Sequence, residues 1–353
     1  MNASFDVVIV GGGVTGAAVG YGLAKRGVKT CLVDAVPTFS RASRANMGLI
    51  WCQSKALGCP QFVRWGFASS RAYGKLAAEL KELSGIDTGY APTGGIIPCL
   101  GEAELEARAQ FIEKLRAETE DGTYPASVLS RKELEGMLPK VPFGPEVSGG
   151  IWSDMDGYVD PLHLMFAFRK SFVRLGGTLF AGERVSEVKP SGKGYAVVCG
   201  GRTLECGKAV LAAGLGVRKL AAQLGTDIPV FPNKSQVMLL ERIPADVLPI
   251  PLLGIARTFG GTVMIGAAHE NMGMDRRLTP EVLAANAQWA VRVWPELERK
   301  RILRFWTGLR VWPKDAYPIY DRIPGHENAF VFAMHSAVSL AAILEQALPD
   351  YVM

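Results

Sequence analysis

Three glycines and a downstream acid near the start of the chain have the types and spacing of a dinucleotide-binding turn. Gly11, Gly13 and Gly16 form GxGxxG within the stretch FDVVIVGGGVTGAAVGYGLAKRGVKTCLVD, residues 5–34. The first glycine permits a tight turn, the second lets the backbone approach a pyrophosphate, and the third lets a helix pack closely on a strand. Asp34 follows about twenty residues later, where an acid suits a ribose hydroxyl pair and disfavours a 2′-phosphate.

The elements that must position these residues can be read from the flanking pattern. Residues 7–10 are apolar and mostly β-branched, which predicts a parallel strand buried on both faces. A helix is expected to begin near Val14, so that the amides of Val14 and Thr15 face the phosphates. Residues 30–33 predict a second strand that ends at the acid, with Ala35 next in the chain. Since these parts occur in order, a bound adenine dinucleotide is favoured over a structural turn.

Composition limits the other functions that the chain could have. With 353 residues, 48% hydrophobic and 21% charged, it can bury a large core and is expected to form two domains. The net charge of +5 includes no run of five like charges, so nucleic acid is not expected as the main partner. The six cysteines show no CxxC spacing, which predicts reduced, mostly buried thiols and no metal site. Glycines interrupt the N-terminal apolar run, so we expect a cytoplasmic protein with at most peripheral membrane contact.

Further along, the sequence resembles a known family of flavoenzymes. The loop RASRANMGLIW, residues 41–51, follows the ribose-binding acid, and residues 157–164 read GYVDPLHL. With GERVSEV at 182–188 and AVLAAGLG at 209–216, the chain resembles the D-amino-acid oxidase superfamily of FAD-dependent oxidoreductases, in its glycine oxidase and sarcosine oxidase branch. The resemblance covers nearly the whole chain, including GAAHENMGMDRRLTPE from Gly266. It implies FAD as the cofactor rather than a nicotinamide.

The resemblance and the glycine motif together imply a set of cofactor-binding residues spread along the chain. They are Gly11, Gly13, Val14, Thr15, Gly16, Asp34, Ala35, Ala42, Ser43, Met47, Gly48, Leu49, Val185, Gly214, His335, Ser336, Ala337, Val338, Ser339 and Leu340.

Arg310 is the candidate for substrate binding and catalysis. It lies in WTGLRVWP, which is similar to the family's Gly-Leu-Arg segment, in which the arginine binds the substrate carboxylate. The physical argument is independent, because a planar guanidinium pairs both oxygens of a carboxylate and so orients the α-carbon against a flat ring. Its neighbours are Trp306, Leu309, Val311 and Trp312, among which an idle charge would be unfavourable.

A second candidate region, VFAMHSAVSLA, matches the family's last strand and the turn before its last helix. Free amides at this turn would stabilise negative charge on reduced flavin. His335 occupies the histidine position, as a flavin contact or as a packed residue without a chemical role. Met334 and Ser339 replace glycines of the family, and Ala337 stands where glycine oxidase has a second arginine. Members of the sarcosine oxidase branch attach their flavin to a cysteine about two residues beyond the position of Arg310. Residues 311–316 contain no cysteine, so the resemblance implies that FAD is noncovalent.

The expected fold is α/β, with a Rossmann-like FAD-binding domain of the glutathione-reductase type and a discontinuous α+β substrate domain that contains a mixed or antiparallel sheet. The order of the motifs assigns residues 1–85, 150–225 and 305–353 to the FAD domain. Residues 86–149 and 226–304 are assigned to the substrate domain.

The expected reaction is oxidation of a C–N bond in a small or N-substituted amino acid, of the glycine, sarcosine, D-amino acid, hydroxyproline or iminodiacetate type. Hydride transfer to flavin N5 would give an imine that hydrolyses to a 2-oxo acid, and oxygen or a carrier would take the electrons. A dicarboxylic amine would need a second cation, for which Lys234 and Arg257 are candidates.

Alternatives remain open at this point. A flavin-dependent 2-hydroxyacid or glycerol-3-phosphate dehydrogenase would share the cofactor domain, as would the flavin subunit of a multi-subunit dehydrogenase, and the chain could form a homo-oligomer or a hetero-subunit assembly. A nicotinamide-only enzyme is the third rival.

Overall fold

A computed structural model of the chain describes residues 3–35, 42–119, 122–266 and 268–353. Arg41, the first residue of the expected flavin loop, and Ala267, within the segment from Gly266, lie outside the described residues, as do residues 1 and 2 of the expected FAD domain.

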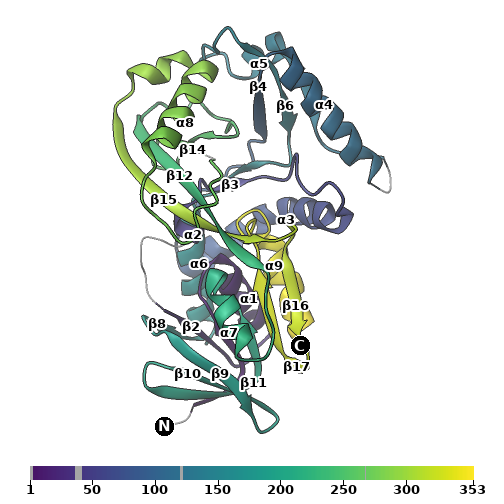
Figure 1. Ribbon diagram of the computed structural model, residues 1–353, viewed down its shortest axis with the longest axis vertical. Coiled ribbons are helices and arrows are strands. Elements are labelled where there is room, and N and C mark those ends of the chain that lie inside the picture. The colour runs from purple at the N-terminus through teal and green to yellow at the C-terminus, as the bar shows by residue number, and fades with distance from the viewer. Residues whose placement is uncertain (1–2, 36–41, 120–121, 267) are drawn as a thin grey trace.

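An eight-stranded sheet forms the lower part of the molecule (Figure 1). Its main path runs β16-β17-β11-β1-β2-β8, in which every pair is parallel except β16 with β17. A hairpin of β9 and β10 extends it through β11. The strands are β1 (Ala3–Val10), β2 (Thr30–Asp34), β8 (Thr178–Ala181), β9 (Val185–Ser191), β10 (Gly194–Cys199), β11 (Arg202–Leu211), β16 (Ile319–Ile323) and β17 (His326–Ala333).

Both faces of this sheet are covered, as the unbroken apolar run of its first strand predicts. Val7 and Ile9 of β1 pack into a core with helices on one face, whereas Val8 and Val10 pack into a second core on the other. The first core contains residues of α1 (Val14–Lys25), α3 (Pro60–Ser84), α6 (Pro161–Arg174) and α9 (Ala341–Val352). The second contains residues of α7 (Val217–Ala222), which follows the short 3-10 helix η1 (Gly214–Gly216), and of the β9–β10 hairpin.

The upper part of Figure 1 contains antiparallel strands. One sheet has the order β13-β14-β12-β15, with the strands β12 (Val230–Arg242), β13 (Ile255–Arg257), β14 (Thr262–Gly266) and β15 (Ile302–Pro313). A second has the order β4-β6-β5, with β4 (Gly95–Leu100), β5 (Ser127–Ser130) and β6 (Val147–Ser153). A parallel bridge between Ile96 and Leu252 joins the two. The other elements here are the helices α4 (Glu102–Ala117), α5 (Arg131–Met137) and α8 (Pro280–Val293) and the 3-10 helix η2 (Pro295–Arg299).

The expected α/β fold with a second, mixed sheet is confirmed. The domain boundaries stay a prediction, and β15 in particular pairs with β12 of the upper sheet along most of its length. All six cysteines are unpaired, and only Cys59 is not fully buried. Within the described ranges, no helix combines the length and the apolar character that crossing a bilayer requires, and no cluster of metal-ligating side chains occurs.

Candidate active site

The glycine turn has the steric requirements that its spacing predicted. Gly11 has φ of 109°, and a Cβ added there would lie 2.4 Å from the carbonyl oxygen of Ala212, at the end of β11. A Cβ on Gly16 would lie 1.9 Å from the carbonyl oxygen of Gly11. The tight turn and the close approach of α1 to β1 therefore both exclude a larger residue.

Ser43 lies against the N-terminus of α1. It belongs to α2 (Ala42–Ala45), and its Oγ accepts a hydrogen bond of 3.0 Å from the amide of Val14. A Cβ on Gly13 would lie 3.0 Å from the same oxygen. The structure thus brings the glycine turn together with Ala42 and Ser43, which the sequence placed at the cofactor from a distant segment. The amide of Thr15, in the first turn of α1, has no acceptor within its helix.

Asp34 is buried at the carboxyl end of β2 and forms an ion pair with Arg169 of α6. The Arg169 guanidinium also donates to the carbonyl oxygen of Gly12, over 2.8 Å from Nε and 2.6 Å from Nη2. Arg169 was missed from the sequence, since nothing in its helical pattern distinguishes it from a surface arginine. The ribose-binding role of Asp34 stays a prediction.

Three other residues expected to contact the cofactor, Ala35, Val185 and Gly214, lie near the ends of strands in the lower sheet. Ala35 follows Asp34, whose carbonyl accepts from the amides of Gly182 and Glu183. These hydrogen bonds place the start of β9, at Val185, beside β2. Gly214 follows β11 with φ of 59°.

The loop after α2 lies between the two sheets. Gly48 has φ of 74°, and a Cβ there would lie 2.1 Å from the carbonyl oxygen of Val159. Leu49 continues into β3 (Leu49–Ile50), which pairs with β7 (Gly157–Tyr158). Met47 is mostly buried in a small cluster with Val237 of β12. The side chain of Met47 therefore packs chiefly against protein.

Strand β15 approaches this loop closely and so brings Arg310 towards the cofactor side. The indole Nε1 of Trp306 donates to the carbonyl of Ala45 over 3.1 Å. A Cβ on Gly308 would lie 2.6 Å from the Cβ of Ala45, so a glycine is needed for this approach.

Three hydrogen bonds orient the Arg310 guanidinium. Its Nη1 donates to Asn233 Oδ1 at 2.9 Å and to the carbonyl oxygen of Ala268 at 2.8 Å, and its Nη2 donates to Ser235 Oγ at 2.8 Å. Asn233 and Ser235 lie on β12, directly paired with β15. Burial lowers the pKa of Arg310 to about 10, which leaves it charged at neutral pH. Nε–H and the second Nη2–H have no partner among the described residues, and such a pair matches the two oxygens of a carboxylate.

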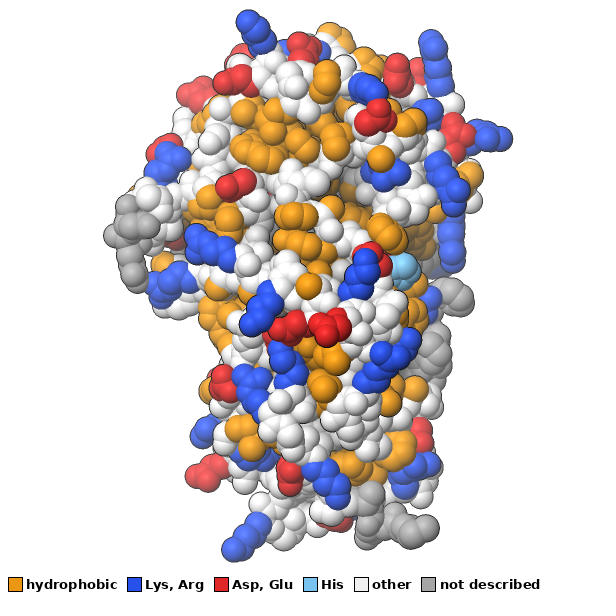
Figure 2. Space-filling view, turned by 180° about the vertical axis from the view of Figure 1, so that it is seen from behind, with side chains coloured by type: hydrophobic (Ala, Val, Ile, Leu, Met, Phe, Trp, Pro, Cys, Tyr) orange, Lys and Arg blue, Asp and Glu red, His pale blue; other side chains and the backbone are white. Residues whose placement is uncertain are grey.

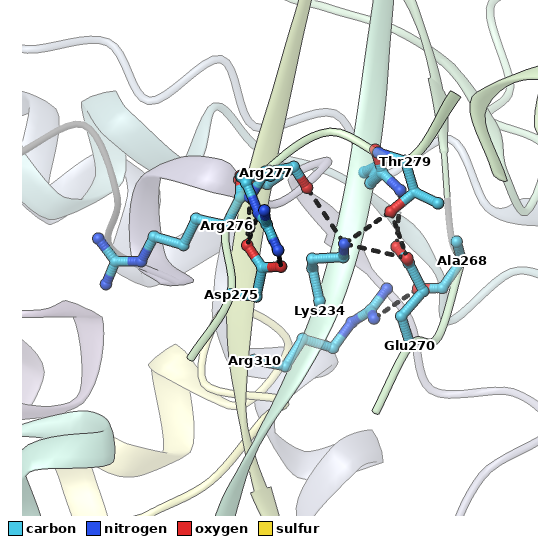
Figure 3. Close-up of polar contacts among 10 residues, drawn as sticks. Lys234, Ala268, Glu270, Asp275, Arg276, Arg277, Thr279 and Arg310 are labelled. Atoms are coloured by element: carbon cyan, nitrogen blue, oxygen red, sulfur yellow. Dashed lines mark hydrogen bonds and ion pairs between the residues drawn. The ribbon is translucent and has the colours of Figure 1, made fainter. Parts of the chain in front are cut away.

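Lys234 of β12 is buried, and its ammonium group is bonded entirely to other groups of the protein (Figure 3). Its ammonium contacts Glu270 at 3.1 Å, Thr279 Oγ1 at 2.8 Å and the carbonyl of Arg277 at 3.1 Å. All three ammonium protons are therefore used within the protein, and Lys234 is not placed to bind a ligand. Arg257, the other candidate cation, donates from Nε to the carbonyl of Ile243.

His269 and His335 both contact the ring of Trp312. The ring centroids of Trp312 and His335 are 4.5 Å apart in a stacked pair, and those of Trp312 and His269 are 5.3 Å apart, edge to face. Burial lowers the pKa of His269 to about 4, with a smaller contribution from Arg310, and lowers the pKa of His335 to about 3. Both imidazoles are therefore neutral at physiological pH.

Their hydrogen-bond partners define the tautomers. His335 Nε2 lies 3.1 Å from the carbonyl oxygen of Ala316, so Nε2 carries the proton and Nδ1 accepts from Ser336 Oγ at 3.0 Å. His269 Nδ1 lies 2.9 Å from Asn233 Oδ1, which also accepts from Arg310 and can only accept. His269 therefore donates from Nδ1 and presents the Nε2 lone pair.

The turn before α9 contains backbone amides without an internal partner, and their binding of a cofactor stays a prediction. The amides of Ala337, Val338 and Ser339 have no acceptor among the described residues, whereas that of Leu340 donates to the carbonyl of Ser336. The Ser339 hydroxyl accepts from the amide of Trp51 at 2.9 Å. Ser339 thus fastens the turn to the end of the flavin loop, and its amide alone remains for a cofactor.

The arrangement fits FAD in two respects. The glycine turn itself carries no side chains, and the amide of Thr15 at the start of α1 has no acceptor within its helix and remains for a pyrophosphate, whereas that of Val14 is bonded to Ser43. The unpartnered amides at 337–339 lie on a turn linked through Ser339 to the flavin loop, where they could bind the carbonyl end of an isoalloxazine ring. The sequence missed Asn233, Ser235 and His269, although the first two alternate on one strand.

Comparisons with known proteins agree with this geometry. The model of a family described as "DAO: FAD dependent oxidoreductase" matches residues 6–344. An opine oxidase subunit of Agrobacterium tumefaciens (strain Ach5) is 35% identical over 338 residues, which are 96% of this chain and 90% of that protein. Glycine oxidase of Geobacillus kaustophilus (strain HTA426) is 27% identical over 340 residues, 95% and 89% of the two chains. The crystal structure of glycine oxidase from Geobacillus kaustophilus has a TM-score of 0.90 and 26% identity, covering 99% of this chain and 95% of that one.

Proposed function

This chain belongs to the DAO family of FAD-dependent oxidoreductases, and from that premise we propose that it oxidises the C–N bond of a small or N-substituted amino acid. The observation that carries the proposal is the Arg310 guanidinium. Asn233, Ser235 and Ala268 hold it in place, and two donors on one edge remain for a carboxylate. The relatives named as an opine oxidase subunit and as a glycine oxidase support the same class of substrate.

In this proposal Arg310 binds the substrate carboxylate through two parallel hydrogen bonds, which fixes the direction of the Cα–H bond. Bound FAD supplies the acceptor for the two electrons of that bond. His269 is exposed and presents an Nε2 lone pair close to Arg310, so it can accept a hydrogen bond from the substrate amine. Such a bond favours an amine that is oriented and neutral, for which no stronger base is required.

His335 acts as a positioning residue in this proposal. Its neutral ring is fixed between Trp312 and the hydrogen bonds to Ala316 and Ser336, so it has no proton to give at physiological pH. The ring thereby fixes the turn whose amides would bind the cofactor.

The experiment is anaerobic titration of the purified yellow protein with glycine, sarcosine, iminodiacetate and an N-carboxyalkyl amino acid, with lactate and glycerol 3-phosphate as the matched hydroxy compounds. Loss of flavin absorbance with an amine and not with a hydroxy compound supports the proposal. Reduction by lactate or glycerol 3-phosphate alone would contradict it.

A second proposal concerns assembly, and the relative named as a subunit favours it. We propose that the chain works as the flavin-bearing subunit of a larger enzyme. Hydrophobic side chains gather in the upper half of the face shown in Figure 2, the half that holds the antiparallel sheets. Ile302, Leu303 and Phe305 of β15 are among the exposed large hydrophobic residues. Slow reoxidation of the isolated chain by oxygen, accelerated by a copurified partner, would support this proposal. Fast oxygen turnover of a monomer would contradict it.

A further inference from the structure

Lys55 is a basic residue at the candidate site that neither the motifs nor the resemblance pointed to. Burial lowers its pKa, and the charge of Arg310 adds to this effect, whereas Asp156 opposes it. Lys55 lies between β3 and α3, and it is half-buried. Its Nζ donates to Ser336 Oγ over 3.5 Å, a long hydrogen bond that spans 281 residues of sequence. Among the residues that the structure describes, no carboxylate lies within ion-pair distance of this ammonium.

The backbone around Lys55 is held in a conformation that side chains disfavour. Ser54 and Ala56, on either side, have φ of 55° and 68°, in the left-handed region. Such conformations persist where surrounding structure imposes them, and they cluster at functional sites. Here Asp156 Oδ1 accepts from the amide of Cys52 at 2.5 Å, and the Tyr317 hydroxyl donates to the carbonyl of Leu57 at 2.6 Å. The loop is therefore anchored on both sides of Lys55.

Lys55 and Arg310 both lie near His335. Lys55 donates to the Ser336 hydroxyl, which donates to His335 Nδ1 over 3.0 Å, and Trp312, two residues after Arg310 on β15, stacks on the His335 ring. Lys55 and Ser336 also line one small cavity together with Trp51 and Phe62. Burial lowers the pKa of His335 most, and the charges of Lys55 and Arg310 both add to that effect. The two cations are therefore connected to the same pair of rings, Lys55 through Ser336 to His335 and Arg310 through strand β15 to Trp312.

Asp156, which accepts from the amide of Cys52 in the same loop, does not fully balance the positive charges of Lys55 and Arg310. Burial raises the pKa of Asp156 to about 7, so its carboxyl group is only partly ionised near neutrality. A protonated Lys55 near Arg310 favours a ligand with two anionic groups, and a bound carboxylate would in turn raise the lowered pKa of Lys55. Lys234 cannot provide the second charge, because all its donors are bonded within the protein.

We propose that Lys55 is the specificity-determining residue that binds the second carboxylate of a dicarboxylic secondary amine, while Arg310 binds the first. The substrate class is an N-carboxyalkyl amino acid, in which one carboxylate lies on each side of the amine nitrogen. This inference rests on the proposed amine oxidation and narrows it. Lys55 takes the place of the missing family arginine at Ala337, from a different loop.

The test uses two redox-inert ligands of the FAD-loaded protein. Glutarate has the carbon frame of iminodiacetate with CH₂ in place of NH, and butyrate is the matching analogue of sarcosine with a single carboxylate. Binding is measured by calorimetry and by the change in flavin absorption, for the wild type, Lys55→Met, Lys55→Arg and Lys193→Met. Lys193 is an exposed lysine in the turn between β9 and β10 and serves as the control.

The expected result is that Lys55→Met raises the Kd for glutarate by about 10- to 100-fold, the range for one lost hydrogen bond between charged groups. The Kd for butyrate should stay within about twofold. Lys55→Arg should recover most of the glutarate affinity, and Lys193→Met should match the wild type. Flavin content and far-UV circular dichroism show whether each variant is folded.

Two results would overturn the inference: a wild type that binds glutarate no more tightly than butyrate, or a Lys55→Met variant that weakens both ligands equally. Failure of the proposed function is a separate outcome, because it appears as the absence of flavin bleaching by any amine. Selective glutarate binding without bleaching would keep the two-carboxylate site and reject amine oxidation.

Discussion

Trp312 and His335 stack with ring centroids 4.5 Å apart and planes inclined by 19°, and so join strand β15 to the turn before α9. Arg310 lies two residues before Trp312 on the same face of β15. The strand that carries Arg310 is thus directly packed against the turn whose amides have no acceptor among the described residues. In the proposed function, this contact sets the spacing between the carboxylate-binding arginine and the cofactor.

His335→Gln should make stability less dependent on pH. The pKa of His335 is about 3 in the folded protein, below its value of about 6.5 in an unfolded chain. The unfolded state therefore binds more protons between these values, and stability is lost as the pH falls from 6.5 to 3. One such group contributes at most about 1.4 kcal/mol per pH unit to the slope.

Urea unfolding across this pH range measures the effect. The slope should be smaller for His335→Gln than for the wild type. Equal slopes for the two proteins would contradict the assignment of a buried neutral imidazole.

Arg310→Lys should impair substrate binding although the charge is retained. An ammonium cannot make the hydrogen bonds to Asn233, Ser235 and Ala268 and also present two parallel donors to a carboxylate. Loss of one or two charge-assisted bonds lowers kcat/KM by about 10- to 1,000-fold. Steady-state kinetics with the best amine substrate measure this, with flavin content as the check on folding. Unchanged kcat/KM would remove Arg310 from the site.

Gly16→Ala should weaken both folding and FAD binding. Its Cβ would lie 1.9 Å from the carbonyl oxygen of Gly11, so α1 would have to move away from the glycine turn. Overpacking of this kind destabilises by about 1–3 kcal/mol. The matched control is Gly136→Ala in α5, where the added Cβ meets nothing within 4 Å. Alanine there should be neutral or stabilising by up to about 1 kcal/mol. Thermal unfolding and the ratio of flavin to protein absorbance distinguish the two variants.

Lys234→Met should destabilise the protein without changing its preference between dicarboxylates and monocarboxylates. Removing the ammonium leaves the Glu270 carboxylate without its ion-pair partner, and breaking a buried pair in this way costs about 3–5 kcal/mol. Lys193→Met, on the surface, should change stability by less than about 0.5 kcal/mol. Chemical unfolding and the ratio of glutarate to butyrate affinities measure the two effects. A change in the ratio of glutarate to butyrate affinities would indicate that Lys234 contacts the ligand, as the sequence suggested.

The glycine turn and the candidate arginine could be predicted from the sequence, because the signal for each is local. About thirty residues contain, in order, the strand, the three glycines, helix α1 and Asp34. Each part can be recognised from its own residue types. Arg310 was recognisable because a charge among apolar and aromatic neighbours needs a partner.

The tertiary structure alone decided which polar groups meet. Arg169 reaches Asp34 across 135 positions, and Lys55 reaches Ser336 across 281. The sequence suggested Lys234 as a second cation for the substrate, but Lys234 is buried in an ion pair with Glu270 and cannot bind a ligand. Lys55 is the residue that we propose for this role instead. Turns and hydrophobic periodicity depend on neighbours along the chain, so the sequence is enough to recognise them. Contacts between charged or polar groups far apart in the sequence depend on how strands and helices pack, so only the folded molecule shows them.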